Sequence, residues 1–125
     1  MDAYLAWLEQ SVGARLAEVA PVVFVRAHLQ WTADRTALPA ILASGSAVVA
    51  RWIGAREANR EVTGSAADGS LNAIVEFDRG QSALVSAESA LGATEPQTQI
   101  LVVGRHGTVR FDDYPDPALL GRKRP

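Results

Sequence analysis

Apolar and polar residues alternate with a period of two along residues 22–31, VVFVRAHLQW. The odd positions are apolar throughout, whereas the even positions include Arg26, His28 and Gln30. Successive side chains of a strand point to opposite faces of a sheet. The pattern therefore predicts a long strand with its odd positions on the core and a largely polar second face.

Shorter runs of the same kind fill residues 69–112. Turn residues separate them: Asp78-Arg79-Gly80 lies between the first two runs, and Gly104-Arg105-His106-Gly107 lies before the last. Alternating runs joined by such short turns are typical of antiparallel hairpins. We therefore expect residues 69–112 to form the core of an antiparallel sheet. The charged residues 56–63 are expected to form an edge strand, because charge protects a sheet edge from unwanted pairing.

Two other segments have helical periodicity. Residues 2–18 place Leu5, Leu8 and Val12 on one apolar stripe, which predicts a helix. Residues 38–53 predict one helix or two short ones, since Ser44-Gly45-Ser46 is a point where a helix could bend or break.

These elements predict the α+β fold class. We expect an open, mainly antiparallel sheet with helices on one face, the other face being polar. The predicted domain is residues 1–112, followed by a tail, residues 113–125. We expect the acidic side chains at the end of the domain and in the tail, Asp112, Asp113 and Asp116, to be solvated.

Composition limits the classes of function. The chain has 125 residues, a net charge of −2 and a pI near 5.6, so it lacks the basic surplus typical of proteins that bind nucleic acid or anionic membranes. No apolar run approaches the ~20 residues of a membrane span. The absence of cysteine excludes disulfides and thiolate chemistry and fits a cytoplasmic protein. The two histidines lie far apart without a ligand motif, so we expect no metal.

Several motifs resemble the C-terminal domain of the Gfo/Idh/MocA oxidoreductases. They are the turn Phe77-Asp78-Arg79-Gly80, the turn Gly104-Arg105-His106-Gly107 followed by Thr108-Val109, and the helix end Arg51-Trp52-Ile53-Gly54. Residues 22–31 are similar to the first long strand of that domain. The resemblance covers about residues 10–112. It implies a sheet domain whose open face packs against another subunit, and hence a homodimer.

Two departures set this sequence apart from complete members of the family. The 125 residues contain neither a Gly-rich nucleotide-binding turn nor the Glu-Lys-Pro motif, and Lys123 is the only lysine. The family's reactive Asp and His positions, counted back from Arg51, fall on Ile41, Gly45 and Val48, none of which transfers protons. We therefore expect no cofactor, and no nicotinamide-dependent dehydrogenase activity from this domain alone.

The polar sheet face is the candidate site. We consider His28, Glu76 and Glu88 as catalytic groups for proton transfer, and Arg26, Gln30, Trp31 and Ser86 as substrate-binding groups. The alternative is a solvated or interface face with paired charges.

Three functions therefore remain open. The first is a non-catalytic sheet domain that dimerises or pairs with a separate oxidoreductase subunit. The second is a cofactor-independent enzyme that carries out proton transfer, isomerisation or cyclisation of a small molecule, for example in a biosynthetic pathway. The third is a fragment of a complete oxidoreductase, against which Met1 and the lost reactive positions argue.

Overall fold

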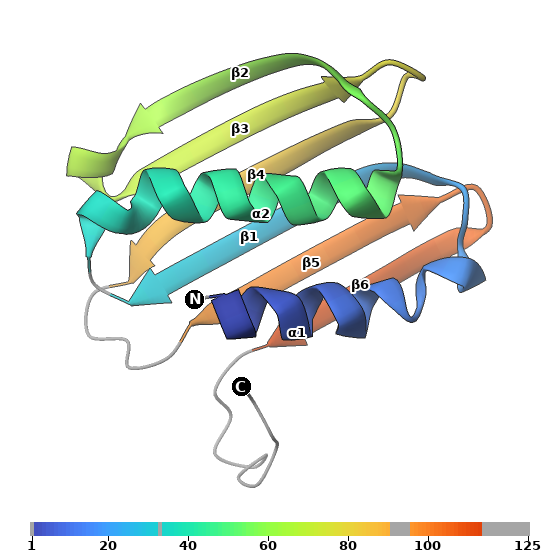
Figure 1. Cartoon of the computed structure of the whole chain (residues 1–125), viewed down its shortest axis with the longest axis horizontal. Helices are drawn as coiled ribbons and strands as arrows, with labels where there is room; N and C mark the ends of the chain where they lie inside the picture. The colour runs from blue at the N-terminus through green and yellow to red at the C-terminus, as the bar shows by residue number, and fades with distance from the viewer. Residues whose placement is uncertain (1, 33, 91–95, 114–125) are drawn as a thin grey trace, which may run out of the picture.

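The fold is known from a computed structural model, which describes residues 2–32, 34–90 and 96–113. Two α-helices, three short 3₁₀ helices and a six-stranded sheet make up this part of the chain (Figure 1). In chain order the elements are α1 (Asp2–Gly13), η1 (Leu16–Glu18), β1 (Val22–Thr32), η2 (Arg35–Ala37), α2 (Leu38–Ile53), β2 (Glu57–Ser65), η3 (Ala66–Asp68), β3 (Ser70–Phe77), β4 (Ser82–Ala90), β5 (Gln97–Gly104) and β6 (Gly107–Asp113).

The strand order across the sheet is β2-β3-β4-β1-β5-β6. All neighbouring strands are antiparallel except β1 and β4, which are parallel at the centre. The α+β class and the mainly antiparallel, open sheet are therefore confirmed. The charged segment 56–63 does form an edge strand, β2, whose residues 57–64 are all exposed.

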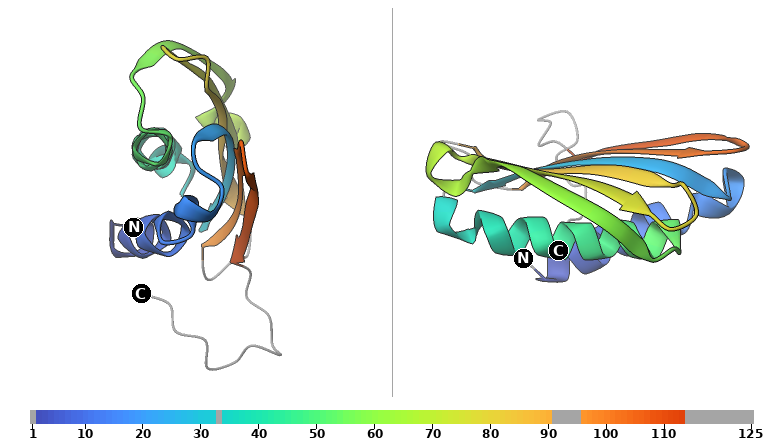
Figure 2. Two further views of the ribbon diagram at one scale, coloured as in Figure 1. Left: turned by 90° about the vertical axis from the view of Figure 1, so that its right-hand side faces the viewer. Right: turned by 90° about the horizontal axis from the view of Figure 1, so that it is seen from above.

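Both helices pack on the same face of the sheet, as the side views show (Figure 2). Their apolar stripes pack against the odd-numbered residues of β1 and against the register partners of those residues on the neighbouring strands. The core contains Leu5, Leu8 and Val12 of α1, Ile41, Val48, Val49 and Trp52 of α2, and Val25, Leu29, Val75, Val85, Ile100 and Val102 of the sheet.

Helix α2 is one continuous helix, which decides between the two predicted arrangements. Gly45 does not break it, because this glycine lies against the sheet. A Cβ atom built there would lie 2.5 Å from Leu29 Cδ1. The small residue thus lets α2 approach β1 closely. The helix ends at Gly54, whose φ of 71° is the left-handed conformation that glycine adopts at helix ends.

Helix α1 is shorter than the periodicity predicted. Its α-helical part ends at Gly13, and the turn from Leu16 to Glu18 is a separate 3₁₀ helix. The beginning of β1 also differs. A register shift between Val22 and Phe24 buries Val22, whereas Val23, expected on the core, is half-buried. Alternation resumes from Val25, where the predicted odd positions are buried up to Leu29.

The end of β6 corrects the expected tail. Asp113 is fully buried, and Tyr4 of α1 donates a hydrogen bond of 2.7 Å to its Oδ2. The same hydroxyl lies 2.7 Å from Thr98 Oγ1 on β5. Burial without partners is costly for a carboxylate, so the hydrogen bond from Tyr4 stabilises the buried Asp113. The same bond links α1 to the end of β6. The rest of the predicted tail, residues 114–125, lies outside the described part of the chain.

The segment Arg35–Ile53 is long and apolar enough to cross a membrane by composition, with a mean hydropathy of 1.4. Half of it is buried inside the fold, however, because α2 covers the centre of the sheet. It is therefore a core helix of this fold.

Candidate functional site

The face of the sheet opposite the helices carries the predicted site residues. We call it the open face and describe it as four rows of side chains that lie across the strands, each row given in the order β2-β3-β4-β1-β5-β6. The strand register defines row 1 as Asn59, Glu76, Ser82, Phe24, Val103 and Thr108; row 2 as Glu61, Ile74, Leu84, Arg26, Leu101 and Arg110; row 3 as Thr63, Asn72, Ser86, His28, Gln99 and Asp112; and row 4 as Ser65, Ser70, Glu88, Gln30 and Gln97.

The structure brings four of the predicted residues together near the middle of the open face. His28 and Ser86 are register partners in row 3, and Gln30 and Glu88 are register partners in row 4. Arg26 belongs to row 2, next to His28 along β1. Trp31 lies in β1 by its backbone, and its side chain is outside what the structure describes.

His28 and Glu88 are in direct contact. His28 Nε2 lies 3.2 Å from Glu88 Oε2, and both side chains are partly exposed. Ser86 Oγ donates instead to Asn72 Oδ1 at 2.7 Å, so this serine is not set up as a nucleophile activated by His28. Glu76 stands opposite Ser82 in row 1, two rows from His28. An imidazole next to a carboxylate is suited to proton transfer, and equally to a polar contact with a partner.

The apolar content of the open face was not used in the sequence-based choice of site. Ile74 is 47% exposed, and its register partner Leu84 is half-buried. Leu101 and Phe24 are half-buried on the neighbouring strands. The sequence did indicate this apolar side chain, because Ile74 is one of the even-numbered residues of 71–77, which share a face with Asn72 and Glu76.

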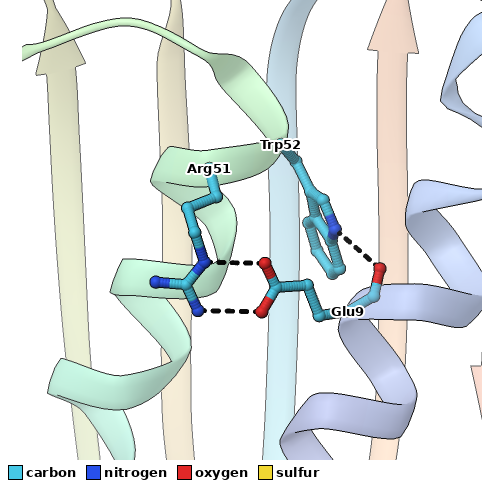
Figure 3. A network of polar contacts seen from close by, with 3 residues as sticks. All are labelled: Glu9, Arg51 and Trp52. Atoms are coloured by element: carbon cyan, nitrogen blue, oxygen red, sulfur yellow. Dashed lines mark hydrogen bonds and ion pairs between the residues drawn. The ribbon is translucent and has the colours of Figure 1, made fainter.

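A second polar group joins the two helices on the other side of the sheet. Arg51 of α2 donates two hydrogen bonds to the Glu9 carboxylate of α1, at 2.6 and 2.8 Å, and Trp52 Nε1 donates to the Glu9 carbonyl at 3.2 Å (Figure 3). The hydrogen bonds from Arg51 lower the pKa of Glu9 below its ordinary value. Shallow hollows of about 260 and 620 Å³ flank this pair. Because these hollows are shallow and lie at the surface, we interpret the Glu9–Arg51 pair as a contact that holds the two helices together and not as a binding site.

The positions at which the resemblance implied reactive side chains lie on the side of α2 that faces the sheet. Ile41, Gly45 and Val48 are all buried against the sheet. The space that Gly45 and Val48 line there measures about 10 Å³ and is bounded by apolar side chains. A cavity of this size holds about one water molecule. In the described part of the chain no three His, Asp or Glu side chains come close enough to bind a metal ion.

The sequence matches no family model, and it matches no curated protein. The fold does resemble solved dehydrogenases. A Thermotoga maritima protein assigned as a dehydrogenase superposes with a TM-score of 0.71 at 11% identity, over 94% of this chain and 41% of that one. Scyllo-inositol dehydrogenase of Lactobacillus casei, solved with NAD(H) and scyllo-inositol, gives 0.62 at 12% identity over 94% and 41%. Myo-inositol 2-dehydrogenase of Lactobacillus plantarum gives 0.59 at 14% identity over 90% and 40%.

At such identities the similarity is one of fold alone. The chain spans about 40% of the length of these dehydrogenases. The fold is thus similar to one domain of Gfo/Idh/MocA-type dehydrogenases, as the motifs in residues 51–54, 77–80 and 104–109 implied.

Proposed function

We propose that this domain is a dimerisation module whose open face packs against a second copy of the chain. The observation that carries the proposal is Ile74, an isoleucine 47% exposed on β3, the second strand from the edge of the open face, with Leu84 and Leu101 in the same row. A solvated face would gain nothing from these apolar side chains, whereas a second sheet would cover them.

The size of the open face supports a stable complex. Six strands spaced about 4.8 Å apart, each about eight residues long, cover roughly 700 Å² on each copy. Two copies would then bury roughly 1,400 Å², which is within the range of specific protein interfaces. The mixture of apolar and polar side chains is also that of an interface and not of a protein core.

We further propose that the described domain carries no nicotinamide chemistry by itself. The positions corresponding to the family's reactive residues, Ile41, Gly45 and Val48, are packed in the core, and the 125 residues contain no Gly-rich nucleotide-binding motif. Any such chemistry would require a separate oxidoreductase subunit or domain that supplies the cofactor. The cysteine-free composition is compatible with the cytoplasm.

One observation favours a second candidate function, proton transfer on a small molecule. The His28–Glu88 contact of 3.2 Å holds an imidazole beside a carboxylate, and Gln30 and Arg26 flank it on the same strand. This alternative requires His28 to remain accessible to a substrate in the assembled protein. Dimerisation that covers row 3 would therefore exclude it.

Substitution of Ile74 tests the dimer directly. We expect Ile74→Glu to weaken self-association by about 2 kcal/mol or more, roughly thirtyfold in Kd, because it removes an apolar contact and buries a charge. Val62→Glu is the matched control. Val62 is 52% exposed on the neighbouring strand, but its register partner Ala73 points to the helix side. Analytical ultracentrifugation of both variants should show dissociation for Ile74→Glu only. Equal behaviour of the two variants would contradict the proposal.

A further inference from the structure

The order of side chains within each row indicates how two copies would meet. A twofold axis that places one open face on another must lie in the plane between the two sheets. Two directions keep identically twisted sheets at a constant spacing: along the strands, or across them. The two directions juxtapose different side chains, so the row composition discriminates between them.

We propose that the axis runs along the strands, between β4 and β1, so that β3 of one copy lies over β5 of the other. This inference rests on the proposed function, because it requires the open face to meet a second copy. With this axis each row faces the same row of the other copy in reverse strand order.

Row 2 shows the complementarity that results. Ile74 faces Leu101 of the other copy, which places an exposed apolar side chain on an apolar one. Leu84 faces the aliphatic stem of Arg26. At the rim, Glu61 of β2 faces Arg110 of β6, a pair of opposite charge. Each of these three contacts occurs twice across the axis.

The polar rows also match under this axis. In row 3, Ser86 faces His28 of the other copy, a hydroxyl against an imidazole. In row 4, Glu88 faces Gln30, a carboxylate against an amide donor. In these two rows polar groups therefore meet hydrogen-bonding partners, which a buried polar face requires. Row 1 matches less well, because Glu76 would face Val103 and Ser82 would face Phe24.

An axis across the strands gives a poorer match. An axis through row 2 would place Arg26 on Arg26 and Glu61 on Glu61, so that like charges meet. An axis between rows 2 and 3 keeps each strand over its own copy and places row 2 on row 3. Ile74 would then face Asn72, Leu84 would face Ser86, and Arg26 would face His28. Apolar side chains would cover polar groups that need partners, and two basic groups would meet. The burial of polar groups without hydrogen bonds disfavours this arrangement.

Cross-linking of engineered cysteines tests the axis. The natural chain has no cysteine, so each introduced thiol is unique. Ile74→Cys chains are mixed with Leu101→Cys chains, equilibrated, and treated with a short bismaleimide. We expect a covalent dimer in the mixture and little with either variant alone. With the axis along the strands, the two copies of residue 74 lie three strand spacings apart, roughly 14 Å sideways.

The remaining outcomes distinguish a wrong axis from the absence of a dimer. An axis across the strands would bring the two copies of residue 74 within roughly 7 Å of each other along the strand. Cross-linking of Ile74→Cys alone, or of Ile74→Cys with Asn72→Cys, would therefore overturn the register. A dimer by light scattering that no pair cross-links would do the same. Monomers of 13.3 kDa with no cross-link would overturn the proposed function as well.

Discussion

Glu9 shows how one residue fixes two helices at once. Its carboxylate accepts two hydrogen bonds from Arg51, and its backbone carbonyl accepts the indole N–H of Trp52. Trp52 is buried, so the second contact anchors α1 to the core, whereas the ion pair lies at the surface. Surface ion pairs contribute little unless their geometry is good, and this one is bidentate.

The pH dependence of stability tests the Glu9 contact. Arg51 lowers the pKa of Glu9 in the folded protein from the ordinary value of 4.5. The stabilisation is therefore complete above pH 4.5 and is lost as the pH falls through the lower, folded value. We expect Glu9→Gln to melt below the wild type at pH 7, and the gap to close under more acidic conditions. Thermal unfolding from pH 3 to 7 measures this gap.

Glu18→Gln is the control for this prediction, because it removes the same charge from an exposed residue whose partner, Arg15, lies on the same segment. We expect this variant to melt close to the wild type at every pH. A constant gap for Glu9→Gln across the pH range would show that the ion pair does not account for the difference.

Single residues were predictable where alternation fixes their side. His28, Ser86 and Glu88 fall on the open face as their positions in the strands required. Asp113 was not predictable in this way. Its partner Tyr4 is 109 positions away in the sequence, and only the packing of α1 beside β5 and β6 brings the two together. Local composition therefore indicated a solvated tail where the fold has a buried carboxylate.

At the scale of elements, the connection between α1 and β1 lies over the turn between β5 and β6. Arg105 N donates to Pro21 O at 3.1 Å, and His106 N donates to Val19 O at 3.3 Å. Gly104 allows this close approach. A Cβ atom there would overlap the Val19 carbonyl oxygen and lie 2.6 Å from its carbon. The obstacle is backbone, so the two elements would have to separate.

We therefore expect Gly104→Ala to destabilise the fold by about 3 kcal/mol or more, at the upper end of the usual cost of overpacking. Gly80→Ala is the matched control in another hairpin turn. Gly80 has a φ of 88°, and no atom lies within 4 Å of the place that a methyl group would take, so its substitution adds only backbone strain, about 1–2 kcal/mol. Urea unfolding compares the two variants. A smaller loss for Gly104→Ala than for Gly80→Ala would contradict the tight crossing.

Strands and helices were predictable because each carries its own period. The boundaries that differed depend on contacts between elements. Helix α2 remains continuous because Gly45 is held against Leu29, and the register shift at the start of β1 buries Val22 in place of Val23. Neither effect appears in the sequence of the element concerned.

At the scale of the whole molecule, the two faces of the sheet differ within the described residues. The helices cover one face, and the parallel pairing of β1 with β4 places the longest strand at the centre of the other. The sequence predicted which residues share the open face. It did not predict their neighbours across strands, because the order β2-β3-β4-β1-β5-β6 separates β1 from the segments that follow it in the chain. The row pattern, and with it the self-complementarity that we propose for the face, depends on that order.

The native mass of the unmodified protein tests the central claim most directly. Light scattering coupled to gel filtration, over a range of concentrations, measures it without any substitution. If two open faces cover each other, the mass is twice the 13.3 kDa of one chain at micromolar concentration. A mass of 13.3 kDa throughout that range would contradict the account, because the exposed Ile74 would then remain uncovered in solution.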